Sequence, residues 1–365
     1  MAILKVNINP KLLEWARKES GFAESQIAEA ISVKLDKYVH WEKNGTEIPF
    51  GKLKDISKQL KRQVATFFLQ EIPPKNKKPK DYRNLNPEDS QLSPETLLAM
   101  RRANKFHTMA MELEGEEYWN QRYVWLKDLK KLKDDDALIN WLRSKLKITI
   151  EDQFHFKNNS DAYKKWRNAI EDNLGILTFQ FTMPIKEVQG FCYSETLPYS
   201  VVVNGKNSDA GRIFTLFHEL AHILKHQSGI CLPDSVNSTQ AIEFDCNSFA
   251  GKFLLPANAI VSTNDPDEIL KFSRRFKVSS EVYLRRMYEE NLLLQSEFFR
   301  LLEVVKSRVK PAKKGFAKST PLQRSINQRG VTFYNTIMEG VNKNKLTYSK
   351  ASDALGLSIK YLIKD

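Results

Sequence analysis

The clearest chemical motif in the sequence is His-Glu-x-x-His, formed by His218, Glu219 and His222 within a strongly helical stretch. Residues four apart are neighbours on one face of a helix. His218 and His222 can therefore direct two imidazole nitrogens at one Zn²⁺, at about 2.0–2.1 Å. Glu219 lies one residue further round and can reach a water on the metal rather than the metal itself. The spacing predicts a zinc site on a helix, with Glu219 as its general base.

A catalytic zinc site needs a third protein ligand and one open position. A metzincin would carry Gly and His where this chain has Lys225 and Ser228, so that class is excluded. The next predicted helix supplies Glu243, followed on the same face by the small residue Ala250. Small residues let this face lie close to the histidine helix. We therefore expect Glu243 to be the third ligand.

Several neighbours of these residues have alternative interpretations. Asn247 shares the face of Glu243 and is expected to support the ligands from outside. His226 is too far along the helix to bind the same ion, and a supporting role or a role at the helix C-terminus is expected. Asp245 points away from the face of the helix that carries Glu243. Cys246 could reach the site, although burial without chemistry is the usual state of a free cysteine.

The expected chemistry is hydrolysis by an activated water. Zn²⁺ lowers the pKa of a bound water to about 7. Glu219 would take its proton and pass it to the leaving group. Tyr193, Tyr199 and His226 are candidates for an oxyanion donor, with structural roles as the alternative. Mn²⁺ or Fe²⁺ could fill the same ligands in place of Zn²⁺.

The rest of the sequence predicts the helices, strands and linkers that surround these residues. Residues 10–70 predict five short helices, with Asn9 as N-cap and Pro10 at the first helical position. Residues 71–90 and 310–315 are basic, Pro-containing linkers. Between the linkers we expect helices, then short strands, then helices again, and 320–365 predicts a helical tail that docks on the central domain. The strands are expected at 177–181, 188–192 and 200–204, and the two site helices at 209–227 and 240–255.

The residues from Arg212 to His222, with Glu243, Asn247 and Phe253-Leu-Leu-Pro256, resemble the ImmA/IrrE family of metallopeptidases over roughly residues 91–300. The resemblance implies His218, His222 and Glu243 as ligands and Glu219 as general base. It also implies an α+β zincin-like (gluzincin) fold in which a strand, here Ser200–Asn204, borders the substrate cleft. A regulatory protein, often a repressor, would be the substrate. Cys246 departs from the family, which usually has Ala there.

Residues 10–70 resemble the phage-repressor-like (Xre-type) helix-turn-helix domains that are often fused to this family. In such domains the third helix enters the major groove, which makes Lys34, Lys37 and His40 candidates for DNA contact and Lys43 a candidate for phosphate contact. Ser32 stands where the turn Gly is usual. The segment has 12 Lys+Arg and 8 Asp+Glu, a net charge of only +4. A helical bundle for protein recognition or dimerisation is the alternative.

The composition of the chain limits its expected partners and location. The chain has 365 residues, 41% of them hydrophobic, and a formal net charge of +13 that favours an anionic partner. Three cysteines make no disulfide framework. No apolar run or signal pattern indicates a membrane, so we expect a cytoplasmic protein. A repressor-type domain would favour a homodimer on two half-sites.

These observations predict a multidomain, mainly α protein. Its expected parts are a helix-turn-helix domain (1–70), a linker (71–90), a zincin-like peptidase domain (91–309), and a basic linker with a helical tail (310–365). The expected function is a zinc metalloendopeptidase that cleaves a protein, a repressor or antitoxin. The alternative is a DNA-binding regulator or antitoxin whose peptidase domain senses metal or binds a partner.

Overall fold

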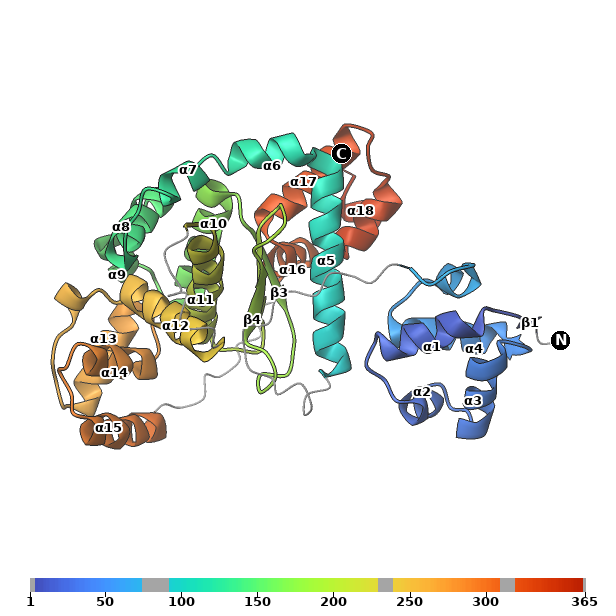
Figure 1. Cartoon of the computed structure of the whole chain (residues 1–365), viewed down its shortest axis with the longest axis horizontal. Helices are drawn as coiled ribbons and strands as arrows, with labels where there is room; N and C mark the ends of the chain where they lie inside the picture. Colours follow the sequence, from blue (N-terminus) through green and yellow to red (C-terminus); the bar gives the residue numbers. More distant parts are fainter. Residues whose placement is uncertain (1–3, 74–91, 229–238, 309–318, 364–365) are drawn as a thin grey trace. The chain divides into compact units, whose positions relative to one another are not determined.

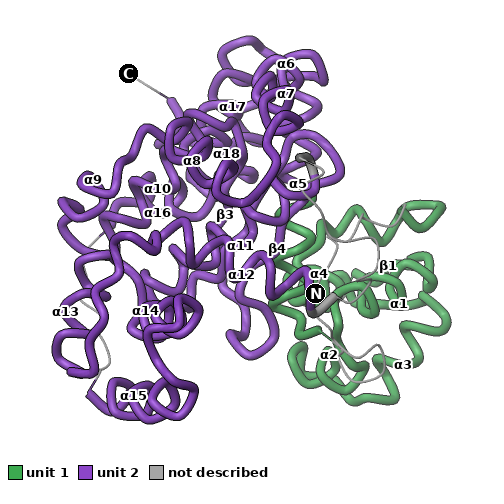
Figure 2. Tube along the Cα trace, turned by 60° about the vertical axis from the view of Figure 1, so that its left-hand side comes forward, with its two compact units in different colours: residues 1–78, 85–104 green, residues 79–84, 105–365 purple. Residues whose placement is uncertain are grey.

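The computed structural model describes residues 4–73, 92–228, 239–308 and 319–363, and it is mostly helical. Two compact units divide the chain: residues 1–78 with 85–104, and residues 79–84 with 105–365 (Figure 2). Residues 85–104 thus group with the first unit, beyond the predicted boundary at residue 70. Most of the predicted first linker and all of the second lie outside the described residues. The assignment of domains stays a prediction.

The first unit contains the five helices expected from the sequence. Their bounds, with those of a short strand pair, are β1 (Lys5–Val6), α1 (Pro10–Lys18), α2 (Glu24–Ala30), α3 (Leu35–Asn44), β2 (Ile48–Pro49), α4 (Phe50–Leu60) and the 3₁₀ helix η1 (Val64–Phe68). The Asn9 side chain accepts a hydrogen bond from the Lys11 backbone at 3.1 Å and caps α1 as predicted. The antiparallel pair β1–β2 was not predicted, because two-residue strands leave no alternation to recognise.

The turn between α2 and α3 positions α3 on the apolar core of the first unit. Ser32 adopts a left-handed backbone with φ of 54°, the conformation for which glycine is usual. Tyr38 and Trp41 on the inner face of α3 are buried in this core. The other face of α3 is exposed to solvent. Gly45, with φ of 67°, ends the helix.

A buried ion pair joins α1 to α3. Arg17 donates to Glu42 through Nη2 at 2.6 Å and through Nε at 2.9 Å, and both residues are buried. The Arg17 guanidinium also donates to the Phe22 carbonyl at 2.9 Å. These bonds satisfy charges that would be costly to bury alone.

Replacing Glu42 with Ala should lower the free energy of unfolding of this unit by about 3 kcal/mol, because the Arg17 charge would stay buried without its partner. Hydrogen exchange of α1 and α3 amides in the full chain would measure the change. The control is Glu14→Ala, which removes the exposed Lys18–Glu14 pair and should cost about 0.5 kcal/mol or less. Equal effects of the two substitutions would contradict a structural role for the buried pair.

The second unit is built around a three-stranded sheet. In its N-terminal part the elements are α5 (Pro94–Glu114, which begins in the first unit), α6 (Glu116–Arg122), α7 (Leu126–Leu129), α8 (Asp135–Leu146), α9 (Ile150–Phe154) and α10 (Asn159–Leu174). The strands β3 (Leu177–Phe181), β4 (Gly190–Tyr193) and β5 (Ser200–Asn204) follow. Next come α11 (Asp209–Ser228), α12 (Thr239–Leu254), η2 (Ala257–Ala259), α13 (Pro266–Phe276), α14 (Ser280–Glu289) and α15 (Gln295–Arg308). No described helix is long and apolar enough to cross a bilayer.

The strand order is β3–β5–β4, with β5 parallel to β3 and antiparallel to β4. Helices cover both faces of this sheet (Figure 1). On one face Phe179 and Phe181 pack against Phe106 of α5. On the other face Arg167 of α10 bonds to Thr178, and Arg212 of α11 bonds to Gln180. Successive side chains of β3 therefore contact the helices on opposite faces of the sheet in alternation.

The C-terminal tail packs against the rest of the second unit, as predicted. Its helices are α16 (Pro321–Arg329), α17 (Val331–Asn342), α18 (Tyr348–Leu355) and η3 (Ile359–Tyr361). The backbone N–H of Thr332 donates to buried Glu171 of α10 at 2.9 Å, and the Phe333 ring packs against the rings of Phe106 and Phe179. The Thr347 side chain caps the start of α18, and Gly356 ends this helix in a left-handed conformation.

Candidate metal centre

The helix α11 lies between the sheet and α12, which buries the central part of α11 almost completely. His218 is 4% exposed and His222 is 6% exposed. Because the two residues are four apart on the helix, their rings project from one face toward α12. Glu243 on α12 projects back toward them.

Three side-chain groups converge at this point. The Nε2 atoms of His218 and His222 are 3.2 Å apart. Glu243 Oε2 lies 3.2 Å from His218 Nε2, and Glu243 Oε1 lies 3.4 Å from His222 Nε2. No other cluster of His, Cys, Asp and Glu in the described part of the chain has the geometry of a metal site.

The separations fit a bound zinc ion. Ligand bonds of about 2.0–2.1 Å in tetrahedral directions place ligand atoms roughly 3.3 Å apart. Burial by itself raises the pKa of the Glu243 carboxyl, but hydrogen bonds and charge from His218 and His222 outweigh it and hold the pKa below its usual range. The carboxylate is thus anionic and placed to share a cation with two imidazoles.

The outer nitrogens of the two imidazoles have different surroundings. Cys246 Sγ lies 3.4 Å from His222 Nδ1, on the side of the ring away from the three-residue cluster. His218 Nδ1 is buried and has no hydrogen-bond partner among the described residues. The sulfur of Cys246 therefore contacts the His222 ring on the side away from the three converging groups and is not one of them.

The Glu219 carboxylate is buried beside strand β4. Gly190 makes room for it, because a Cβ at that position would lie 3.0 Å from Glu219 Oε1 and 2.8 Å from the Val202 carbonyl oxygen. Burial raises the pKa of the Cys192 thiol on the same strand, and the nearby Glu219 carboxylate raises it further. The strand beside Glu219 is thus β4, at the edge of the described sheet. The prediction that Ser200–Asn204 borders the cleft is wrong, because β5 is the central strand and pairs on both sides.

A cavity of about 480 Å³ opens beside the cluster. His218, Glu243 and Asn247 form part of its wall. The support of the ligands by Asn247 stays a prediction. The sequence analysis missed the remaining lining residues. These are Gln189 before β4, Gly211, Phe214 and Thr215 on α11, and Ser279, Glu281, Val282 and Arg285 at α14. Phe214 and Thr215 precede His218 by one helical turn, a spacing that could have identified them.

Three candidates from the sequence lie elsewhere. His226 is exposed, one turn beyond His222 near the C-terminal end of α11, and it does not line the cavity. Its expected support of the ligands is therefore not borne out by any described contact. Tyr193 and Tyr199 are buried and also do not line the cavity. The Tyr193 ring lies 5.4 Å from the His107 ring, and the Tyr199 ring lies 4.7 Å from the Tyr123 ring, which indicates packing roles.

The two described thiols should be unreactive in the native protein. Burial raises the pKa of Cys192 and of Cys246, so both thiols are protonated at pH 8 and shielded from reagents. In a Cys231→Ser variant, which removes the cysteine outside the described residues, a chromogenic disulfide reagent should detect no fast thiol at pH 8. The same protein should show two thiols in denaturant. A fast native thiol would contradict this description of the site.

Residues 171–288, about a third of the chain, match the family model described as the IrrE N-terminal-like domain, Peptidase_M78. The match runs from the end of α10 through α14 and includes His218, Glu219, His222 and Glu243. No curated protein and no solved structure matches the chain. The match supports a metal-dependent peptidase domain of the IrrE/ImmA type in this part of the molecule.

Proposed function

We propose that this chain is a zinc-dependent regulatory endopeptidase that cleaves a protein substrate, a transcriptional repressor or an antitoxin. The observation that carries the proposal is the convergence of two imidazole nitrogens and a carboxylate at 3.2–3.4 Å beside Glu219. The match to a peptidase family over these residues gives independent support. Mn²⁺ or Fe²⁺ remains an alternative to Zn²⁺ with the same ligands.

The mechanism assigns a role to each group. A divalent ion held by His218, His222 and Glu243 would supply a Lewis acid for the peptide carbonyl and the attacking water. Glu219 accepts the proton of that water and returns it to the leaving amine. Gly190 of β4 leaves room for the Glu219 carboxylate, and Cys192 on the same strand lies near it. The walls of the cavity provide room for substrate side chains on either side of the cleaved bond.

Metal removal tests the proposal. The zinc-loaded full chain is incubated with the repressor-like protein encoded beside it, with and without a chelator, and the products are sequenced. We expect one defined cut that the chelator abolishes and that added zinc restores. A cut that is insensitive to the chelator would indicate a contaminating or different protease.

We propose DNA binding as the role of the first unit. The exposed face of α3 carries Lys37, His40 and Lys43, exposed Lys34 precedes the helix as its N-cap residue, and α2 and α3 are joined by a short turn. These features suit a helix that enters the major groove. Binding of mixed-sequence duplex DNA should weaken with salt, and a Lys34→Glu, Lys37→Glu variant should bind more weakly with a shallower salt dependence. Unchanged binding would favour the alternative of protein recognition or dimerisation.

The competing function is a DNA-binding regulator or antitoxin whose metal site serves as a sensor. Such a protein would need the three ligands but no general base. The presence of Glu219, buried next to the site, favours the peptidase. Homodimerisation on two half-sites would accompany either function.

A further inference from the structure

One wall of the metal cavity is formed by the N-terminal half of α14. Ser279, Val282 and Arg285 follow one another at three-residue spacing and therefore share one side of the helix. All three line the cavity that also contains His218 and Glu243. Because α14 supplies none of the three proposed ligands, its side chains in this wall can contact a substrate and add selectivity to the site.

Arg285 is a cation without a protein partner in this wall. Two carboxylates on the same helix, Glu281 and Glu289, lie four residues before and four residues after Arg285. Glu281 instead pairs with Lys306 at 3.7 Å, and Glu289 pairs with Arg286 at 2.7 Å. Within the described part of the chain, no hydrogen bond or ion pair involves the exposed Arg285 side chain. Its guanidinium is therefore available to a ligand in the cavity.

The neighbouring Arg286 holds α14 in place. It is 2% exposed, donates to the Leu255 carbonyl at 3.2 Å, and pairs with Glu289 and Glu290. Its Cδ lies so near Gly251 of α12 that a Cβ there would be only 2.9 Å away. Because α12 also carries Glu243, this contact fixes the helix that bears Arg285 relative to the helix that bears the ligand.

We propose that Arg285 forms a subsite that binds an acidic side chain of the protein substrate near the cleaved bond. This inference rests on the proposed peptidase function and adds a substrate class to it. A guanidinium binds a carboxylate through two parallel hydrogen bonds, which makes an Asp or Glu side chain its best match. Glu281, the other charged group in this wall, lies against Lys306 and so does not offer an unpaired negative charge.

The test uses short peptide hydroxamates, whose hydroxamate group binds the metal and whose side chains then enter the neighbouring subsites. At each of three positions beside the hydroxamate the peptides carry Glu, Gln or Lys. Calorimetry measures their affinity for the zinc-loaded full chain. At one position the wild type should bind the Glu peptide at least about tenfold more tightly than the Gln peptide.

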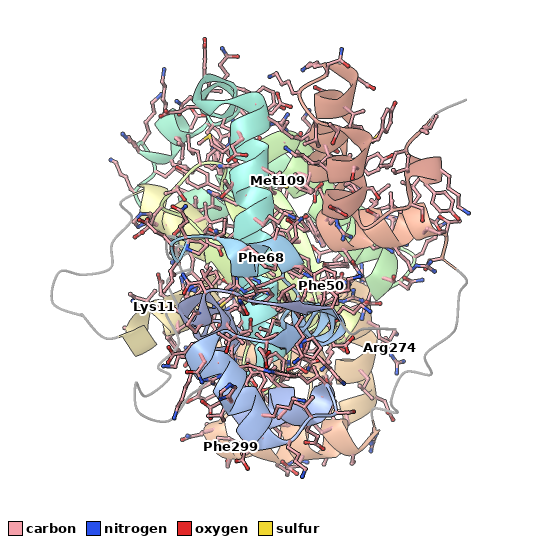
Figure 3. All side chains as sticks on the ribbon, turned by 90° about the vertical axis from the view of Figure 1, so that its right-hand side faces the viewer. Lys11, Phe50, Phe68, Met109, Arg274 and Phe299 are labelled. Atoms are coloured by element: carbon pink, nitrogen blue, oxygen red, sulfur yellow. The ribbon has the colours of Figure 1, made fainter. Side chains whose placement is uncertain are left out.

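Two substitutions and one control assign this preference to Arg285. Arg285→Gln should abolish it, and Arg285→Glu should reverse it in favour of Lys. The control is Arg274→Glu, which makes the same charge change at an exposed residue of α13 outside the cavity wall (labelled in Figure 3) and should keep the wild-type preference. Because Arg285 and Arg274 are both exposed, neither change should disturb the fold.

The outcomes separate this inference from the proposed function. Hydroxamates that bind without any preference for Glu, or a preference that survives Arg285→Gln, would overturn the subsite and leave the metal site intact. A protein that binds neither zinc nor any hydroxamate would overturn the proposed function, and the subsite with it.

Discussion

Replacing Glu219 with Gln should slow peptide-bond hydrolysis by about a thousandfold while the protein keeps its metal ion and its fold. The amide has the shape of the carboxylate but cannot accept the proton of the attacking water. The ligand atoms belong to other residues, so metal binding should be unaffected. Cleavage rate and zinc content are measured on the same preparation. The rate should fall while the zinc content stays the same.

The matched control for this change is Glu281→Gln. It makes the same chemical substitution at a carboxylate in the wall of the same cavity, but at a residue that pairs with Lys306 and contacts none of the ligands. We expect less than about a tenfold change in rate. If Glu219→Gln retained a tenth of wild-type activity or more, Glu219 could not be the general base.

Replacing Glu243 with Gln should weaken zinc binding by more than a hundredfold. The loss of a direct ligand must exceed the roughly 10–100-fold cost of losing a group that only supports a ligand. The neutral amide would also leave the two imidazoles without the negative charge that now faces them. Competition with a chromogenic chelator measures the affinity, and circular dichroism checks that the variant is folded.

Asp245→Asn provides the control in the same helix. The Asp245 carboxylate pairs with Lys225 at 2.6 Å and is not part of the cluster of His218, His222 and Glu243. Its substitution should change zinc affinity by less than about tenfold. Similar losses in both variants would mean that the helix as a whole, rather than the Glu243 carboxylate, determines metal affinity.

The grouping of His218, His222 and Glu243 could be predicted from the sequence, because their positions depend on local geometry. His218 and His222 share a face through the helical repeat alone, and Glu243 was found from the next helix and its small residues. The bounds of the two site helices, predicted at 209–227 and 240–255, agree with α11 and α12 to within one residue for the same reason. In the first unit, Asn9 and Pro10 mark the start of α1 directly.

The surroundings of the ligands could not be predicted, because they depend on tertiary packing. Strand lengths and composition do not reveal the order β3–β5–β4, so the resemblance alone assigned Ser200–Asn204 to the border of the cleft, in error. Arg285 has no spacing relation to the His-Glu-x-x-His motif and joins the cavity only because α14 packs on α12 at Gly251. The approach of Cys246 to His222 likewise depends on how two helices cross.

The most direct test of the metal centre is the X-ray absorption spectrum of the zinc-loaded full chain. The geometry predicts a coordination shell of nitrogen and oxygen atoms at about 2.0–2.1 Å, with outer-shell scattering from two imidazoles. It predicts no sulfur, because Cys246 lies behind the His222 ring. A sulfur shell at about 2.3 Å, or scattering from fewer than two imidazoles, would contradict the assignment of His218, His222 and Glu243 as the ligands.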